Sequence, residues 1–130
     1  MGTLARMVST SFPVRFTGWN RFMKVLGMSP SNSYLEIDAE EVRVRMGWTF
    51  SLVAPRASVG SAELDDRRVW GWGVHGWRGR WLVNGSSSGI VRFPIDPPVR
   101  ARLLAIVPIT VHEIRISLDD PSAAIDLLAA

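Results

Sequence analysis

Apolar and polar side chains alternate with a period of two through most of the chain after residue 33, which is the pattern of strands with one buried face. Leu35, Ile37, Val42 and Val44, for example, alternate with charged or polar neighbours. The same period returns at short intervals, separated by glycine, proline and charged residues. We expect seven short strands, over residues 34–38, 41–47, 49–53, 57–64, 80–84, 90–95 and 111–118.

Before residue 34 the pattern is different. Residues 12–17 alternate and contain a proline, which predicts an edge strand. Trp19, Phe22, Met23 and Leu26 then follow at spacings i, i+3, i+4 and i+7, which predicts a short amphipathic helix.

The C-terminal segment has the clearest helical signals. Asp120 can cap a helix, Pro121 suits its first position, and Ile125 and Leu128 fall on one side. The chain is therefore predicted to be mainly β, a seven-stranded antiparallel barrel or sandwich with this helix as a cap. Asn84-Gly85 predicts a hairpin turn, and residues 99–104 are ambiguous between helix and loop.

The length of 130 residues predicts one domain, with residues 1–33 as an N-terminal extension and residues 34–130 as the barrel; Met1 and Met7 are alternative starts. The net charge is +3, but positive charge is concentrated in one basic segment, because residues 67–102 carry seven arginines and one acidic residue. This segment favours an anionic partner or simply forms a solvated basic face. The start contains no apolar run typical of a signal peptide, so a cytoplasmic protein is expected.

Residues 69–89, VWGWGVHGWRGRWLVNGSSSG, hold four of the six tryptophans among glycines and arginines. In one interpretation all four tryptophans fill the core, and the glycines allow a tight crossover. In the other, Trp81 is in the core while Trp70 and Trp72 lie exposed beside arginines and anchor a partner. The candidate binding residues are Arg67, Arg68, Trp70, Trp72, His75, Trp77, Arg78 and Arg80.

Seven strands closed by one C-terminal helix resemble the pleckstrin-homology-like (PH-like) barrel. The run GWGVHGWRGRWLVNGSSSG with the ending DDPSAAIDLLAA is also similar to a small group of uncharacterised actinobacterial proteins. The wider fold implies binding of peptide or protein surfaces and sometimes of lipid headgroups. Lipid-binding members carry a basic cluster around the first hairpin, whereas the corresponding turn here is DAEE, so phosphoinositide recognition is not implied.

The function expected from these features is a non-catalytic binding module for a protein or peptide, with a second copy of the chain as an alternative partner. The second interpretation is peripheral membrane binding through the Trp/Arg segment and residues 19–26. Negligible binding to anionic vesicles is expected, because the sequence offers no acyl site and no polybasic run. No nucleic-acid-binding motif is present, so no nucleic acid is expected as a partner.

Catalysis is the third interpretation. GSSSG matches G-x-S-x-G, and Ser87, Asp96 and His112 follow in the order of a hydrolase triad. A nucleophile elbow, however, needs a strand before the serine and a helix after it, and the pattern here predicts a hairpin tip. The chain has no cysteine, and His75 and His112 have no metal-ligand spacing, so neither a metal nor a cofactor is expected.

Overall fold

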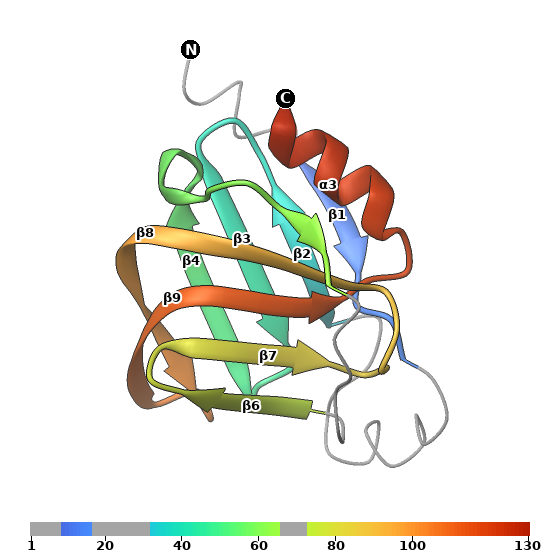
Figure 1. Cartoon of the computed structure of the whole chain (residues 1–130). Helices are drawn as coiled ribbons and strands as arrows, with labels where there is room; N and C mark the ends of the chain where they lie inside the picture. The colour runs from blue at the N-terminus through green and yellow to red at the C-terminus, as the bar shows by residue number, and fades with distance from the viewer. Residues whose placement is uncertain (1–8, 17–31, 66–72) are drawn as a thin grey trace.

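The computed structural model describes residues 9–16, 32–65 and 73–130, which form one curled β-sheet and a C-terminal helix (Figure 1). The chain is mainly β, as predicted. The elements are β1 (Thr10–Pro13), β2 (Ser33–Ile37), β3 (Glu41–Met46), β4 (Phe50–Pro55), the 3₁₀ turn η1 (Arg56–Ser58), β5 (Glu63–Leu64), β6 (Gly73–Trp77), β7 (Arg80–Asn84), β8 (Ile90–Leu103), β9 (Val107–Ser117) and α3 (Pro121–Ala129).

The sheet has nine strands in the order β1-β2-β3-β4-β8-β9-β7-β6, with β5 paired to β8. Neighbouring strands are antiparallel except for β7 and β9, which are parallel. The expectation of an entirely antiparallel sheet is therefore wrong. Within the described part of the chain, β1 and β6 end the order and do not pair with each other, so the sheet is not closed.

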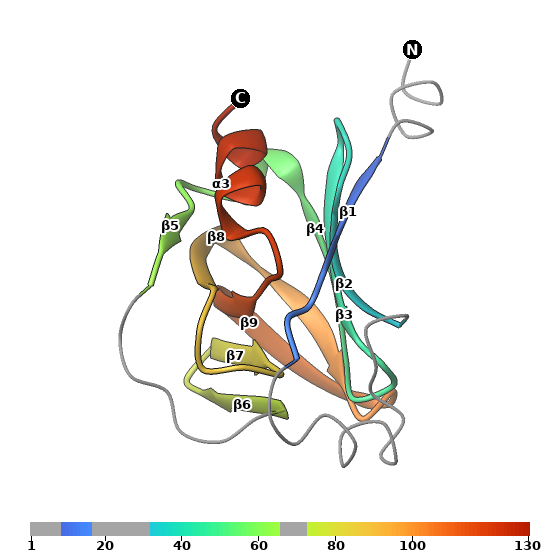
Figure 2. The same ribbon diagram turned by 90° about the vertical axis from the view of Figure 1, so that its right-hand side faces the viewer.

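The core lies between two parts of the curled sheet. In the side view of Figure 2, β1 to β4 run along one side and β6 to β9 along the other. The alternation that predicted β2, β3 and β4 is the alternation of buried and more exposed positions in the structure. Fully buried side chains from both sides meet in one cluster that includes Leu35, Ile37, Val44, Met46, Phe50, Leu52, Phe93, Ile114 and Ile116.

Helix α3 begins as predicted. An Asp120 carboxylate oxygen accepts a hydrogen bond from the Ala123 amide at 3.2 Å, and Pro121 occupies the first turn. Ala124 is fully buried, while Ile125 and Leu128 are half-buried against the core. The small side chain at position 124 lets the helix pack closely on the sheet.

Of the strand expected over residues 57–64, only the last two residues form a strand, β5. After Pro55 the chain makes the turn η1, forms a single bridge at Val59 and pairs with β8 only at β5. Arg56 explains this path, because its guanidinium donates to the carbonyls of Asp38 at 3.1 Å and Leu127 at 2.7 Å. The segment is thereby held across the end of the sheet near α3 instead of along the sheet.

Strands β8 and β9 are longer than predicted. Residues 99–103, for which the sequence pattern allows helix or loop, continue β8, and β9 begins at Val107 instead of residue 111. The turn between them has no Gly, Pro or Asn, so it carries no sequence signal. Proline residues near position 97 do not end β8; they lie in an irregular stretch where the register with β9 shifts between Pro94 and Val99.

Asn84-Gly85 does not form a hairpin, because β7 and β8 both pair with β9 and lie on opposite sides of it. Residues 85–89 therefore cross the end of β9. The Gly85 amide donates to Ser117 Oγ at 3.0 Å, and Asn84 donates to the Ser86 carbonyl at 2.9 Å. Gly85, Asn84 and Ser86 are buried, so GSSSG is not an exposed hairpin tip.

The N-terminal predictions are tested in part. β1 is an edge strand, as expected, but it covers Thr10–Pro13, and the following residues make single bridges from Val14 to Leu118 and from Phe16 to Gly85. The helix predicted over residues 19–26 lies, like the rest of residues 17–31, outside the described residues.

A candidate binding groove on β6, β7 and β9

The tryptophan- and glycine-rich stretch contains a β-hairpin that the sequence pattern did not predict. Trp77 pairs with Arg80, and the two residues between them, Arg78 and Gly79, have φ of +54° and +83°. Two successive left-handed residues make the turn that suits a two-residue hairpin. Glycine at the second position also leaves room for the His112 ring, which a Cβ at Gly79 would meet at 2.5 Å.

The inner face of this hairpin explains the glycine at position 76. Gly76 pairs with Trp81, and the Trp81 ring lies where a Cβ on Gly76 would be. The other neighbour of Trp81 is Phe50, at a ring-centroid distance of 6.2 Å. Trp81, predicted to be a core residue, is half-buried and packs against the buried cluster without being a member of it.

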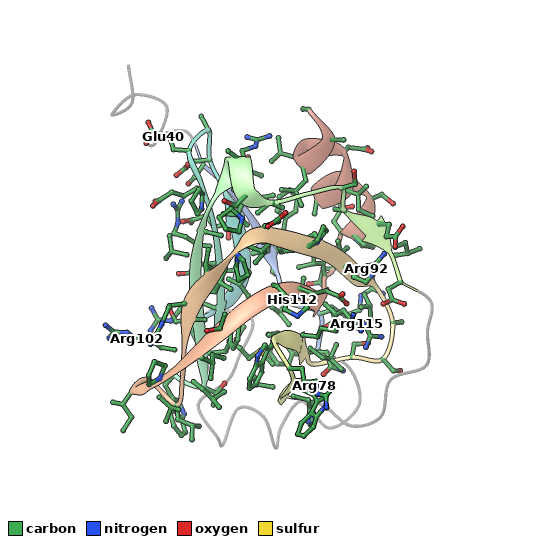
Figure 3. All side chains as sticks on the ribbon, turned by 60° about the vertical axis from the view of Figure 1, so that its left-hand side comes forward. Glu40, Arg78, Arg92, Arg102, His112 and Arg115 are labelled. Atoms are coloured by element: carbon green, nitrogen blue, oxygen red, sulfur yellow. The ribbon has the colours of Figure 1, made fainter. Side chains whose placement is uncertain are left out.

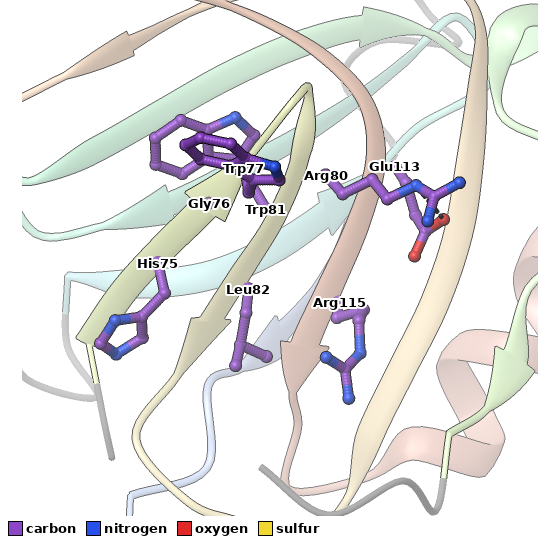
Figure 4. Close-up of a pocket in the computed structure, with 8 residues that line it drawn as sticks. All are labelled: His75, Gly76, Trp77, Arg80, Trp81, Leu82, Glu113 and Arg115. Carbon is purple, nitrogen blue, oxygen red and sulfur yellow. Dashed lines mark ion pairs between the residues drawn. The ribbon is translucent and has the colours of Figure 1, made fainter. Parts of the chain in front are cut away.

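The outer face of the hairpin carries the side chains that alternate along β6, β7 and β9 with those of the inner face. His75, Leu82 and Arg115 occupy one row across β6, β7 and β9, and Trp77, Arg80 and Glu113 occupy the next. Together with Gly76 and Trp81 these residues line a groove of about 350 Å³ (Figure 4). Trp77 is 75% exposed, so it forms a rim and does not fill the core.

The charged side chains that line this groove differ in how closely they are paired with opposite charges. Arg115 Nε donates to the nearly buried Asp65 carboxylate at 2.7 Å, although its Nη2 is buried without a partner among the described residues. Glu113 lies 3.8 Å from Arg80 and 3.9 Å from Arg92, and Arg92 also pairs with Glu63. Glu113 is thus shared, while the Arg80 side chain remains 70% exposed.

A second hollow, of about 440 Å³, adjoins the same rim and is lined by Trp77, Arg78, Arg80 and His112. The Arg78 guanidinium lies 5.8 Å from the centre of the Trp77 ring, within the range of a cation–π contact. His112 Nε2 is 2.8 Å from the Arg78 carbonyl oxygen, which ties the turn to β9. The two hollows share Trp77 and Arg80.

Half of the sequence-predicted binding residues are described, and the structure brings them together: His75, Trp77, Arg78 and Arg80. Arg67, Arg68, Trp70 and Trp72 lie outside the described residues. The prediction missed Leu82, Glu113 and Arg115. The alternation in residues 111–118 places Glu113 and Arg115 on the polar face, but no sequence signal shows that β7 pairs with β9.

The serine, aspartate and histidine of the triad are not brought together. Ile90 pairs with Ser117, so Ser87 lies past the end of β9, whereas His112 is five residues earlier on that strand. At about 3.3 Å per residue, this separates Ser87 from His112 by roughly 15 Å. Asp96 lies in the irregular part of β8, and His112 is directed to Arg78.

Within residues 9–16, 32–65 and 73–130, no three His, Asp or Glu side chains gather closely enough to hold a metal ion. The same ranges contain no helix of the length and hydropathy needed to cross a membrane. Comparisons with known protein families, with characterised proteins and with solved structures find no match to this chain.

Proposed function

We propose that this protein is a non-catalytic binding module whose groove on β6, β7 and β9 takes an extended segment of a partner protein or peptide. The observation that supports this function is the rim formed by Trp77 and Arg80, which are largely exposed and line both hollows. Tryptophan and arginine are the residues most enriched among binding hot spots. The exposed indole ring of Trp77 offers a large apolar face to a partner.

An extended ligand fits the rim better than a small molecule does. Small-molecule sites bury most of their ligand in an enclosed cavity. Here the two hollows are open and meet at Trp77 and Arg80, so a ligand that follows them must cross the rim. A peptide chain has the length to contact both hollows.

The charge favours a partner with an acidic side chain beside an apolar one. Arg80 shares Glu113 with Arg92, and Arg78 lies against Trp77. A carboxylate on the partner would accept the charge-assisted hydrogen bonds that the guanidinium groups of Arg78 and Arg80 can still donate. An apolar neighbour would cover Trp77 and the half-buried Leu82.

The PH-like architecture and the relationship to actinobacterial proteins are part of the same proposal. A strongly curled sheet with a C-terminal helix packed on it supports the first. The parallel pairing of β7 with β9 and the open order of the sheet are departures from a closed antiparallel barrel. The resemblance of the Trp/Gly stretch and the C-terminal ending supports the second.

Selection of peptides from a displayed random library on the full chain tests this function. Selected peptides are expected to carry Asp or Glu within a few positions of an aromatic or aliphatic residue. Their affinity, measured by fluorescence anisotropy, should fall about tenfold or more in Trp77→Ala, as for a central hot spot. Arg80→Gln should weaken binding less and reduce its dependence on salt.

Trp48→Ala is the matched control, because Trp48 is an exposed tryptophan in the turn between β3 and β4 and lines neither hollow. It should leave peptide affinity unchanged. Peptides that bind the double variant Trp77→Ala/Arg80→Gln as well as the wild type would show that the groove is not the binding site.

A further inference from the structure

Large apolar side chains are exposed together at one end of the molecule, away from the groove lining. Ile106, Leu104 and Val107 of the β8–β9 turn are 83%, 46% and 41% exposed, and Trp48 of the β3–β4 turn is 52% exposed. The two turns are neighbours, because the Leu104 amide donates to the Thr49 carbonyl at 2.8 Å. These four residues, called here the apolar tip, form a cluster, whereas exposed apolar residues on a soluble protein are usually scattered.

The apolar surface continues inward from the tip. A hollow of about 280 Å³ lies beside it and is lined by Thr49, Val74, Leu103 and Leu104. Three of these four residues are aliphatic.

The β8–β9 turn places apolar residues in a backbone conformation that disfavours side chains like theirs. Leu104 and Ala105 have φ of +52° and +66°, in the left-handed region that glycine and asparagine occupy more readily. Asn-Gly would suit this turn better. Strain of this kind at exposed positions is typical of functional sites.

The surroundings of the tip are basic. Arg45 of β3 and Arg100 and Arg102 of β8 are exposed, and the register places Arg45 and Arg102 in one row on either side of Ser51. Residues 42–62 and 97–112, which form both turns and the adjoining strands, contain no acidic residue.

The acidic residues of the β2–β3 turn lie at the other end of the molecule. Asp38, Glu40 and Glu41 are at the end near α3, and the β8–β9 turn is at the opposite end in both views (Figures 1 and 2). Figure 3 shows Glu40 and Arg102 well separated on this axis. The molecule is therefore polarised along its length.

The combination of exposed apolar side chains and arginines favours an anionic lipid surface over a second copy of the chain. A symmetric contact between two copies through the tip would set Arg45, Arg100 and Arg102 against the same residues of the second copy. An anionic bilayer, in contrast, accepts aliphatic and tryptophan side chains at its interface and attracts arginines to its headgroups. We propose that the apolar tip inserts shallowly into anionic lipid surfaces, with these three arginines on the lipid phosphates.

The proposed attachment does not use the turn through which lipid-binding PH-like proteins would be expected to bind, since residues 38–41 are acidic and distant. It also differs from the membrane interpretation based on Trp70 and Trp72, which lie outside the described residues. The proposal differs from the expectation of negligible vesicle binding, because that expectation rests on the sequence pattern, whereas the structure exposes residues 104–107 together. With one shallow insertion and no acyl chain, binding should be reversible and dependent on salt.

Co-sedimentation of the full chain with vesicles of phosphatidylcholine and phosphatidylserine tests the proposal. The wild type should bind these vesicles at low salt, bind less at high salt, and bind pure phosphatidylcholine weakly. Ile106→Ser should lower partitioning about tenfold, because the side chain loses most of its apolar area. Replacing Arg100 and Arg102 by glutamine should lower it about fivefold for each arginine.

Leu64→Ser is the matched control for Ile106→Ser. Leu64 in β5 is 61% exposed but lies between acidic neighbours Glu63 and Asp65, so its replacement should leave vesicle binding unchanged. The double variant Leu104→Asn/Ala105→Gly separates binding from folding. It should melt at or above the wild-type temperature, because both residues tolerate positive φ, and still lose vesicle binding.

Wild-type protein that stays in the supernatant with anionic vesicles would overturn the proposal, as would equal binding by Ile106→Ser and the wild type. A concentration-dependent dimer without vesicles that Ile106→Ser abolishes would assign the tip to a second copy instead. Trp77→Ala/Arg80→Gln should bind vesicles like the wild type. The proposal for the peptide groove and the proposal for the lipid surface can therefore be refuted independently.

Discussion

Replacing Gly76 by alanine should destabilise the protein, although the usual effect of this change in a strand has the opposite sign. Glycine within a strand is about 0.5–1 kcal/mol less favourable than alanine, because it loses more backbone entropy on folding. At Gly76, however, the added methyl group would enter the space of the Trp81 ring. Overpacking of this kind costs about 1–3 kcal/mol, so the net loss should be about 1–2 kcal/mol.

A double-mutant cycle shows whether the Trp81 ring is the cause. Trp81→Ala alone should destabilise the protein, because Trp81 packs against the core and lies 6.2 Å from Phe50. Since Trp81 is only half-buried, the loss should fall near the lower end of the range of about 3–5 kcal/mol for buried tryptophan. In the Trp81→Ala background, Gly76→Ala should become neutral or stabilising, with a coupling energy of about 1–3 kcal/mol.

Urea denaturation followed by circular dichroism measures the four free energies of unfolding that the cycle requires. His75→Ala is the control, because His75 is next to Gly76 but on the outer face of the hairpin. Gly76→Ala that stabilises both backgrounds equally would refute the register of β6 against β7. The two rows of side chains that line the groove depend on that register.

Two further predictions concern residues outside the groove. Burial alone would raise the pKa of Asp38, but the amides of Glu40 and Glu41 and the Arg43 guanidinium outweigh it and hold this pKa below its ordinary value of 3.8. Asp38→Asn should therefore cost about 1–3 kcal/mol in urea denaturation at neutral pH, and the difference should shrink as the pH falls below 3.8. Ser87→Ala should change the free energy of unfolding by less than about 0.5 kcal/mol, because Ser87 is exposed, and a fluorophosphonate probe should not label Ser87. Labelling that is lost in the His112→Ala variant would revive the hydrolase.

Local patterns sufficed where each strand pairs with its neighbour in sequence. The β2, β3 and β4 meander is such a case, since the alternating side chains lie close to their partners and turns join them directly. Helix α3 is another, because its Asp120 cap and Pro121 are local signals. In both cases the information lies within about ten residues, where periodicity and capping operate.

Long-range pairing was not accessible in this way. Val83 pairs with Ile116 in the parallel β7–β9 ladder. No local sequence signal predicts that β9 lies between β7 and β8 in the sheet. Asn84-Gly85, a hairpin signal in isolation, is instead buried where the chain crosses the end of β9. The groove also depends on this long-range pairing. His75, Trp77 and Arg80 come from the β6–β7 hairpin, whereas Glu113 and Arg115 come from β9.

The strained positions connect the two proposed surfaces. Within the described residues, the non-glycine residues with positive φ are Arg78, Leu104 and Ala105. Arg78 is in the turn beside the groove, and Leu104 and Ala105 are in the turn of the apolar tip. Glycine or asparagine would relieve strain at these positions, but neither would present a guanidinium group over Trp77 or an aliphatic side chain to a bilayer. Both proposed surfaces therefore contain residues held in a costly backbone conformation, which is expected if those side chains contact partners.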